Sequence, residues 1–226
     1  MLGVTVNTLA VVVGGLVGLL IKKGVPERYS DAIMKGFGLC VLYIAIKGAL
    51  DGTNVLVLIV SVAIGAVVGT FLKLDEGIHA LGDKLEKRFS SGDGKSTFAQ
   101  GFVTASLVFC VGAMTVVGSL DAGLTGDNST LYTKALLDGI MSIVFASTLG
   151  VGVLFSAVLI FVFQGAIAIL AGVIQPFLTD YSIAEMGCVG SVIMMAVATN
   201  MMGITKVKVM NLVPAIFLPI ILCMFM

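Results

Sequence analysis

The chain has no Trp, a single His, four Pro and few charged residues, with Asp, Glu, Lys and Arg making up 12% of its 226 residues. So little charge cannot cover the surface of a soluble domain, and hydrophobic residues reach 58%. The 13 basic and 13 acidic side chains cancel, so no basic surface favours a nucleic-acid partner. The composition therefore predicts an all-α, polytopic membrane protein whose main partner is the lipid bilayer.

Catalytic and metal-binding motifs are also missing. The sequence has no Gly-x-Ser-x-Gly, no His-Glu-x-x-His, and no second His or Cys near His79. Residues 91–97 imitate the end of a phosphate-binding loop, but Phe89 stands where the first Gly is required. The four Cys lie far apart in apolar runs, which favours reduced thiols used in packing. We expect no enzyme activity, no cofactor and no metal site.

Long apolar runs divide the chain into membrane spans. Crossing about 30 Å of hydrocarbon takes roughly 20 helical residues. A single membrane domain is predicted over residues 1–226, with three spans in 1–72 and five in 98–226. The eight predicted spans are 4–21, 34–50, 55–72, 98–120, 131–149, 151–177, 183–204 and 209–226.

Between the third and fourth spans lies the only sizeable polar segment, residues 73–97. Its apolar residues, from Ile78 to Phe89, recur at helical spacing opposite a mostly basic face. This pattern predicts an amphipathic helix on the cytoplasmic membrane surface, followed by a linker. A solvated connector is the alternative.

The distribution of basic residues predicts the orientation. Eleven of the thirteen Lys and Arg fall on one side of the membrane, and only Lys47 and Lys134 fall on the other. Because basic residues mark the cytoplasmic side, we expect both termini outside.

Small residues recur every four positions in two of the spans. The first span carries Ala10, Gly14 and Gly18. The third carries Ser61, Gly65 and Gly69 at the same spacing. Such faces predict close contact with neighbouring helices.

Two polar side chains fall well inside predicted spans. Asp138 lies seven residues into the fifth span, and Lys134 stands four residues earlier on the same helix face. Asp138 is therefore either a site residue or half of a neutral pair whose lysine extends to the interface. Gln164 falls near the middle of the sixth span, as an interhelical clasp or a substrate-facing group. Asn7 lies near a span end and has lower functional weight.

The stretch from Ala146 to Val153 separates two apolar runs without any charge. It predicts either a tight turn or a re-entrant hairpin within residues 131–177. Helix breaks of this kind are where transporters bind substrates and ions.

Short motifs throughout the chain resemble those of the YqgA/YdfK-like bacterial membrane proteins, the family called domain of unknown function 554. The motifs are Gly101-Phe102, Ala105-Ser106-Leu107, Phe109-Cys110-Val111-Gly112, Gly118-Ser119, Leu137-Asp138-Gly139, Ala146-Ser147-Thr148-Leu149-Gly150, Gln164-Gly165 and Asn211-Leu212-Val213-Pro214. The resemblance implies a bacterial inner-membrane protein and, at most, a transporter. It brings no established activity, ligand or catalytic residue.

These features favour a secondary transporter of an unidentified small solute or ion, working by alternating access as a homodimer. The predicted substrate-binding residues are Asp138, Gln164, Ser106, Ser142, Ser147 and Thr148. A channel is the neighbouring alternative. A scaffold or sensor that does not transport is the competing class, in which these polar residues only pack helices.

Overall fold

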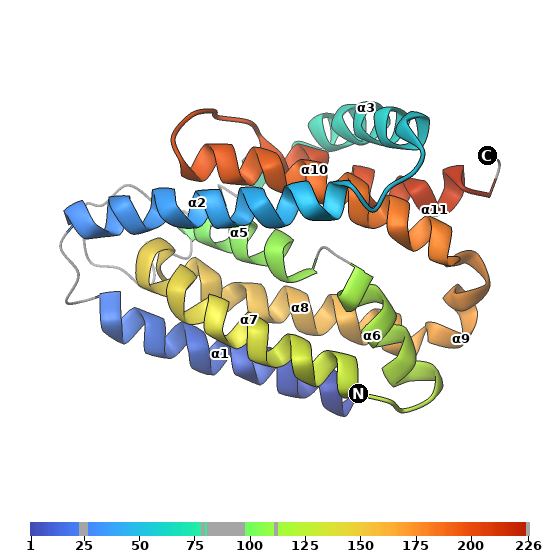
Figure 1. Cartoon of the computed structure of the whole chain (residues 1–226), viewed down its shortest axis with the longest axis horizontal. Helices are drawn as coiled ribbons and strands as arrows, with labels where there is room; N and C mark the ends of the chain where they lie inside the picture. Colours follow the sequence, from blue (N-terminus) through green and yellow to red (C-terminus); the bar gives the residue numbers. More distant parts are fainter. Residues whose placement is uncertain (23–26, 78–79, 81–97, 111–112, 225–226) are drawn as a thin grey trace.

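The computed structural model describes the chain except residues 23–26, 78–79, 81–97, 111–112 and 225–226 (Figure 1). Every regular element in the described part is helical, which confirms the predicted fold class. The elements are α1 (Leu2–Lys22), α2 (Glu27–Ala49), α3 (Val55–Phe71), α5 (Phe98–Cys110), α6 (Ala113–Leu124), α7 (Ser129–Leu149), α8 (Gly152–Ile169), α9 (Ala171–Ile174), η1 (Gln175–Phe177), α10 (Asp180–Met201), η2 (Val209–Phe217) and α11 (Leu218–Leu222).

The bundle is built from four principal helix pairs: α1 with α7, α2 with α10, α3 with η2, and α5 with α8 (Figure 1). Helices α1 and α7 run in the same direction, because Gly3 meets Leu131 at one end and Gly18 meets Ala146 at the other. Helices α3 and η2 run in opposite directions. These relative directions are the ones that eight alternating crossings require.

Glycines bring α1 directly against the backbone of α7. A Cβ atom added to Gly14 would lie 2.2 Å from the Gly139 carbonyl oxygen, and one added to Gly18 would lie 2.2 Å from that of Ile143. We call this contact the α1–α7 glycine seam.

The α3–η2 glycine seam repeats the arrangement. A Cβ on Gly65 would lie 2.5 Å from Ala215 Cα, and one on Gly69 would lie 2.0 Å from the Asn211 carbonyl oxygen. Both close contacts predicted from the four-residue spacing are therefore confirmed.

The described residues contain four helices long and apolar enough to cross a membrane: α1, α2, α8 and α10. A fifth is added if α5 and α6 count as one broken span. Helix α3 and residues 209–222 are shorter apolar helices. The membrane-spanning class is therefore clear, and the count of eight crossings stays a prediction.

Three predicted spans are not continuous helices. The one predicted at 209–226 consists of the 3₁₀ helix η2 followed by the short helix α11. The span predicted at 98–120 is divided between α5 and α6, whose axes differ by 60°. The span predicted at 151–177 ends as α8 at Ile169 and continues as the short elements α9 and η1. Pro176 explains part of this, since proline cannot donate the hydrogen bond that a continuing α-helix needs.

The junction between α7 and α8 is a tight turn. Gly150 has a φ of 81°, a left-handed conformation that favours glycine, and its N–H caps α7 on the Ala146 carbonyl. Helix α7 has 21 residues and α8 has 18, so each is long enough for a crossing. The stretch thus forms a turn between two long helices, and the choice between two crossings and a re-entrant hairpin within residues 131–177 stays a prediction.

The predicted amphipathic helix at 73–97 lies mostly outside the described residues. At its start, Glu76 forms a salt bridge with Lys208, in the loop before η2. The hydrogen bond between these side chains lowers the pKa of Glu76 and raises that of Lys208, so both stay charged at neutral pH. This pair joins the segment after α3 to the end of the bundle where α10 finishes.

Candidate functional site

Helices α1, α7 and α8 enclose four polar side chains, which we call the polar cluster: Asn7, Lys134, Asp138 and Gln164. Asn7 and Gln164 are 0% exposed, Asp138 is 5% exposed and Lys134 is 6% exposed. Because α1 and α7 run side by side, the start of α1 reaches residues more than 120 positions further along the chain.

Direct hydrogen bonds join the cluster. The Lys134 amine donates to both carboxylate oxygens of Asp138, at 2.9 and 2.8 Å. The amide nitrogen of Asn7 donates to Asp138 Oδ2 at 3.1 Å and to Gln164 Oε1 at 3.3 Å. Asn7 therefore connects the two residues that the sequence singled out.

Two atoms of the cluster have no hydrogen-bond partner among the described residues: the acceptor Asn7 Oδ1 and the donor Gln164 Nε2. A buried polar atom without a partner costs roughly 1–3 kcal/mol. The cluster thus holds one acceptor and one donor that a water, an ion or a solute could satisfy.

The ion pair makes the cluster electrically neutral. An ammonium and a carboxylate with this little exposure each lose several kcal/mol of hydration, which their short contacts offset. The expectation that Lys134 extends to the interface is wrong, because its side chain is buried against Asp138. A neutral pair is nonetheless formed, as one alternative predicted.

Helix α5 packs against α7, the helix that carries Lys134 and Asp138: the rings of Phe109 on α5 and Phe145 on α7 have centroids 5.9 Å apart. The axes of α5 and α6 differ by 60°.

The other predicted site residues lie at varying distances from the cluster. Ser142, one turn beyond Asp138, donates to the Val11 carbonyl of α1 at 2.7 Å. Ser147 and Thr148 donate to carbonyls of their own helix, about 14 Å of helical rise from Asp138. Ser106 is buried on α5, and its hydroxyl has no hydrogen-bond partner among the described residues. Among the described residues, none of these four side chains hydrogen-bonds to the polar cluster.

The depth expected for Gln164 is wrong. Because α8 ends at Ile169, Gln164 lies about 8 Å from the helix end by rise per residue, not at the middle of a long span. Asn7 was expected near a span end, but its side chain is fully buried and its amide bonds both Asp138 and Gln164.

Sequence reasoning missed Glu185 altogether. This carboxylate of α10 is 0% exposed and accepts the backbone N–H groups of Thr53 at 2.7 Å and Asn54 at 2.9 Å. Its other oxygen has no partner among the described residues. The available signal was that Glu185 is the only charged residue in the run 183–204.

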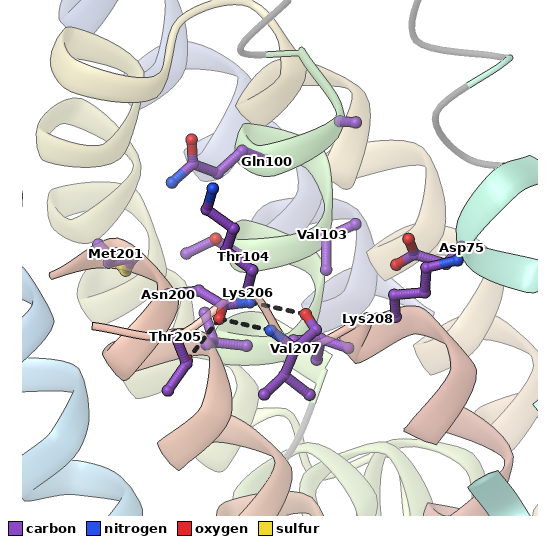
Figure 2. Close-up of a pocket in the computed structure, with 13 residues that line it drawn as sticks. Asp75, Gln100, Val103, Thr104, Asn200, Met201, Thr205, Lys206, Val207 and Lys208 are labelled. Carbon is purple, nitrogen blue, oxygen red and sulfur yellow. Dashed lines mark hydrogen bonds between the residues drawn. The ribbon is translucent and has the colours of Figure 1, made fainter. Parts of the chain in front are cut away.

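Cavities lie at both ends of α10. One of about 340 Å³ lies between the start of α5, the end of α10 and the loop before η2 (Figure 2). The other, of about 320 Å³, adjoins the start of α10 and is lined by Asp51 and Asp180 among others. Neither is lined by a member of the polar cluster.

The helical fold, the apolar exterior and the buried ion pair define a polytopic helical membrane protein. The family model "Protein of unknown function (DUF554)" matches residues 2–224, and the chain belongs to this family. It is 34% identical over 223 residues to "Uncharacterized membrane protein YdfK" of Bacillus subtilis (strain 168), covering 97% of this chain and 94% of that one. It is 29% identical over 220 residues to "Uncharacterized protein YqgA" of Escherichia coli (strain K12), covering 96% and 94%. No solved structure matches the chain.

Proposed function

We propose that this protein is a secondary transporter of a small solute or ion, with the polar cluster as its binding site. The observation that carries the proposal is the unpartnered acceptor of Asn7 and donor of Gln164 beside a buried ion pair. Polar and ionisable groups at membrane depth are costly, and they commonly mark substrate or ion pathways.

The ion pair suits an exchange of partners. A cationic group of the solute would compete with Lys134 for Asp138, and an anionic group would compete with Asp138 for Lys134. When the site is empty, the two side chains neutralise each other, so the unloaded protein can change conformation without moving an uncompensated charge through the membrane. Asn7 and Gln164 would orient the solute.

Alternating access needs an element that can rearrange beside the site. Helix α8 would have to move relative to α1 and α7, because each of these three helices contributes a side chain to the polar cluster. A homodimer, expected from the sequence, belongs to this proposal, and the mass of the protein in lipid nanodiscs tests it.

A paired substitution separates a transport site from a structural clasp. Replacing Lys134→Met and Asp138→Leu together removes both charges, and such replacements in protein interiors are often neutral or stabilising. We expect the double variant to stay folded and to lose uptake into proteoliposomes of any solute that stabilises the parent in a thermal-shift screen.

The outcomes are distinct. Undiminished uptake by the double variant, at matched protein levels, would remove the ion pair from the mechanism. A stable double variant, together with a screen in which no solute stabilises the parent, would favour the scaffold. Uptake without counterflow of preloaded solute would favour the channel.

We also propose that the protein lies in the bacterial cytoplasmic membrane with both termini outside. The eleven-to-two distribution of basic residues supports this orientation. In intact cells, single cysteines at positions 24, 92 and 206 should resist a membrane-impermeant thiol reagent, and cysteines at 53, 126 and 180 should react. Labelling of position 92 from outside would reverse the orientation.

A further inference from the structure

We propose that the cavity at the Lys206 end of the bundle binds a small oxoanion, meaning a carboxylate or phosphate group. The cavity has a volume of about 340 Å³, near the lower end of the range for small-molecule sites. It is lined by the start of α5, the end of α10 and the loop before η2 (Figure 2). This inference does not depend on the proposed role of the polar cluster.

Hydrogen-bond donors converge on the cavity from two sides. Gln100 and Thr104 are four residues apart on α5, so they share one face of that helix. Lys206 comes from the opposite wall, and Figure 2 shows its amine pointing toward the Gln100 amide. An amide, a hydroxyl and an ammonium are the groups that hold carboxylates and phosphates in proteins.

These donors are not occupied elsewhere in the described chain. Thr104 is buried, yet its hydroxyl has no hydrogen-bond partner among the described residues, and neither has the Gln100 amide. Within the same part of the chain, no carboxylate lies within salt-bridge distance of the Lys206 amine. An anion could therefore accept hydrogen bonds from Gln100, Thr104 and Lys206 without breaking an existing bond.

Asn200 fixes the loop that presents Lys206. Its Oδ1 accepts the Thr205 hydroxyl at 2.7 Å and the Val207 N–H at 2.9 Å, and its amide nitrogen donates to the Val207 carbonyl at 2.8 Å (Figure 2). These bonds hold the residues on both sides of Lys206. The backbone is thus ordered before a ligand arrives, which lowers the entropic cost of binding.

The remaining charges indicate where the anion would lie. Lys208 lines the cavity but is neutralised by Glu76, and Asp75 lies on the same side (Figure 2). An anionic group is therefore favoured at the wall formed by Gln100, Thr104 and Lys206, away from Asp75. Both a soluble anion and the phosphate of a lipid headgroup have the required chemistry.

Thermal unfolding of the detergent-purified protein, followed with a dye that reacts with buried thiols as they become exposed, tests the inference. Sodium phosphate and sodium acetate are titrated against sodium chloride at equal ionic strength. We expect a saturable rise in Tm with phosphate or acetate and none with chloride. Equal shifts with all three salts, or no shift with any, would overturn the proposal.

Variants assign the effect to the cavity. Lys206→Gln should weaken apparent affinity about tenfold or more, and Thr104→Val by several-fold, since a hydrogen bond to a charged ligand contributes more than a neutral one. Lys206→Arg should retain most of the affinity. Lys47→Gln, which removes an exposed charge at the opposite end, is the matched control and should bind as the parent does. Parent-like binding by Lys206→Gln would contradict the assignment.

Two further experiments identify the source of the anion and test whether the cavity is independent of the polar cluster. If a lipid phosphate fills the cavity, the response to free phosphate seen in detergent should disappear in nanodiscs of phosphatidylglycerol or phosphatidylcholine, since both headgroups carry a phosphate; persistence in both indicates a soluble anion. The Lys134→Met, Asp138→Leu double variant should retain the response. Its loss in that variant, if the protein is folded, would show that this cavity and the polar cluster are not separate sites.

Discussion

The bundle has two comparable halves. One is formed by α1, α7 and α8, and the other by α2, α3, α10 and η2. Each half contains a glycine seam and a buried carboxylate. The carboxylates differ in what they contact. Among the described residues, Asp138 is bound only by the side chains of Lys134 and Asn7, whereas Glu185 accepts two backbone N–H groups of the loop between α2 and α3, together with the Thr53 hydroxyl. Side chains can change rotamer and release a partner, but these N–H groups stay with their loop. Asp138 is thus suited to exchange, and Glu185 to anchoring.

The largest expected effect comes from breaking the ion pair on one side only. Asp138→Ala should destabilise the protein by about 3–5 kcal/mol, because Lys134 would remain buried without a counter-charge. Thermal unfolding in detergent measures the loss, and removal of both charges should restore stability. A single variant as stable as the parent would show that the pair is solvated.

The next largest effect is expected for Glu185→Ala, which should lower the free energy of unfolding by roughly 2–3 kcal/mol. The variant loses the hydrogen bonds to the carboxylate and leaves two backbone N–H groups unpaired. Glu185→Gln keeps an acceptor oxygen and should cost less. The same unfolding measurement checks the order of the two variants, and a reversed order would argue against anchoring by Glu185.

Alanine in either glycine seam should destabilise by about 1–3 kcal/mol, because the added methyl group meets backbone atoms that cannot move aside cheaply. Gly14→Ala and Gly69→Ala test one seam each. Gly36→Ala is the matched control, since nothing lies within 4 Å of its added Cβ. If one seam tolerates alanine and the other does not, the two halves are not packed alike.

The smallest effect distinguishes a bonded hydroxyl from an unbonded one. Ser142→Ala should cost about 1 kcal/mol through loss of its bond to Val11. Ser61→Ala should be close to neutral, since the buried Ser61 hydroxyl has no partner among the described residues. Equal costs would indicate a water-mediated partner at Ser61.

Much of this architecture was predictable because it leaves local marks in the sequence. Long apolar runs indicate membrane helices, and small residues at every fourth position indicate both glycine seams. Asp138 and Gln164 were recognised because charge and amide groups are rare in apolar runs. Of the six predicted site residues, these two are joined by the Asn7 side chain, and the side chains of the other four form no hydrogen bond with the cluster in the described part of the chain.

The features that could not be predicted depend on contacts between residues far apart in the sequence, or on changes of helix direction that no sequence motif indicates. Asn7 joins the cluster only because α1 packs along α7, and its position near the start of the chain gives no sign of that partner. Apolar and small residues continue from α5 into α6, so composition does not reveal the 60° angle between the two helices. Glu185 needed only closer attention to a lone acid in an apolar run.

The two glycine seams also determine which parts of the bundle can move. Backbone contacts one turn apart join α1 to α7, and a second set joins α3 to η2, so sliding within either pair would drive main-chain atoms into one another. Each pair therefore moves as a rigid body. Relative motion is left to the contacts between the pairs.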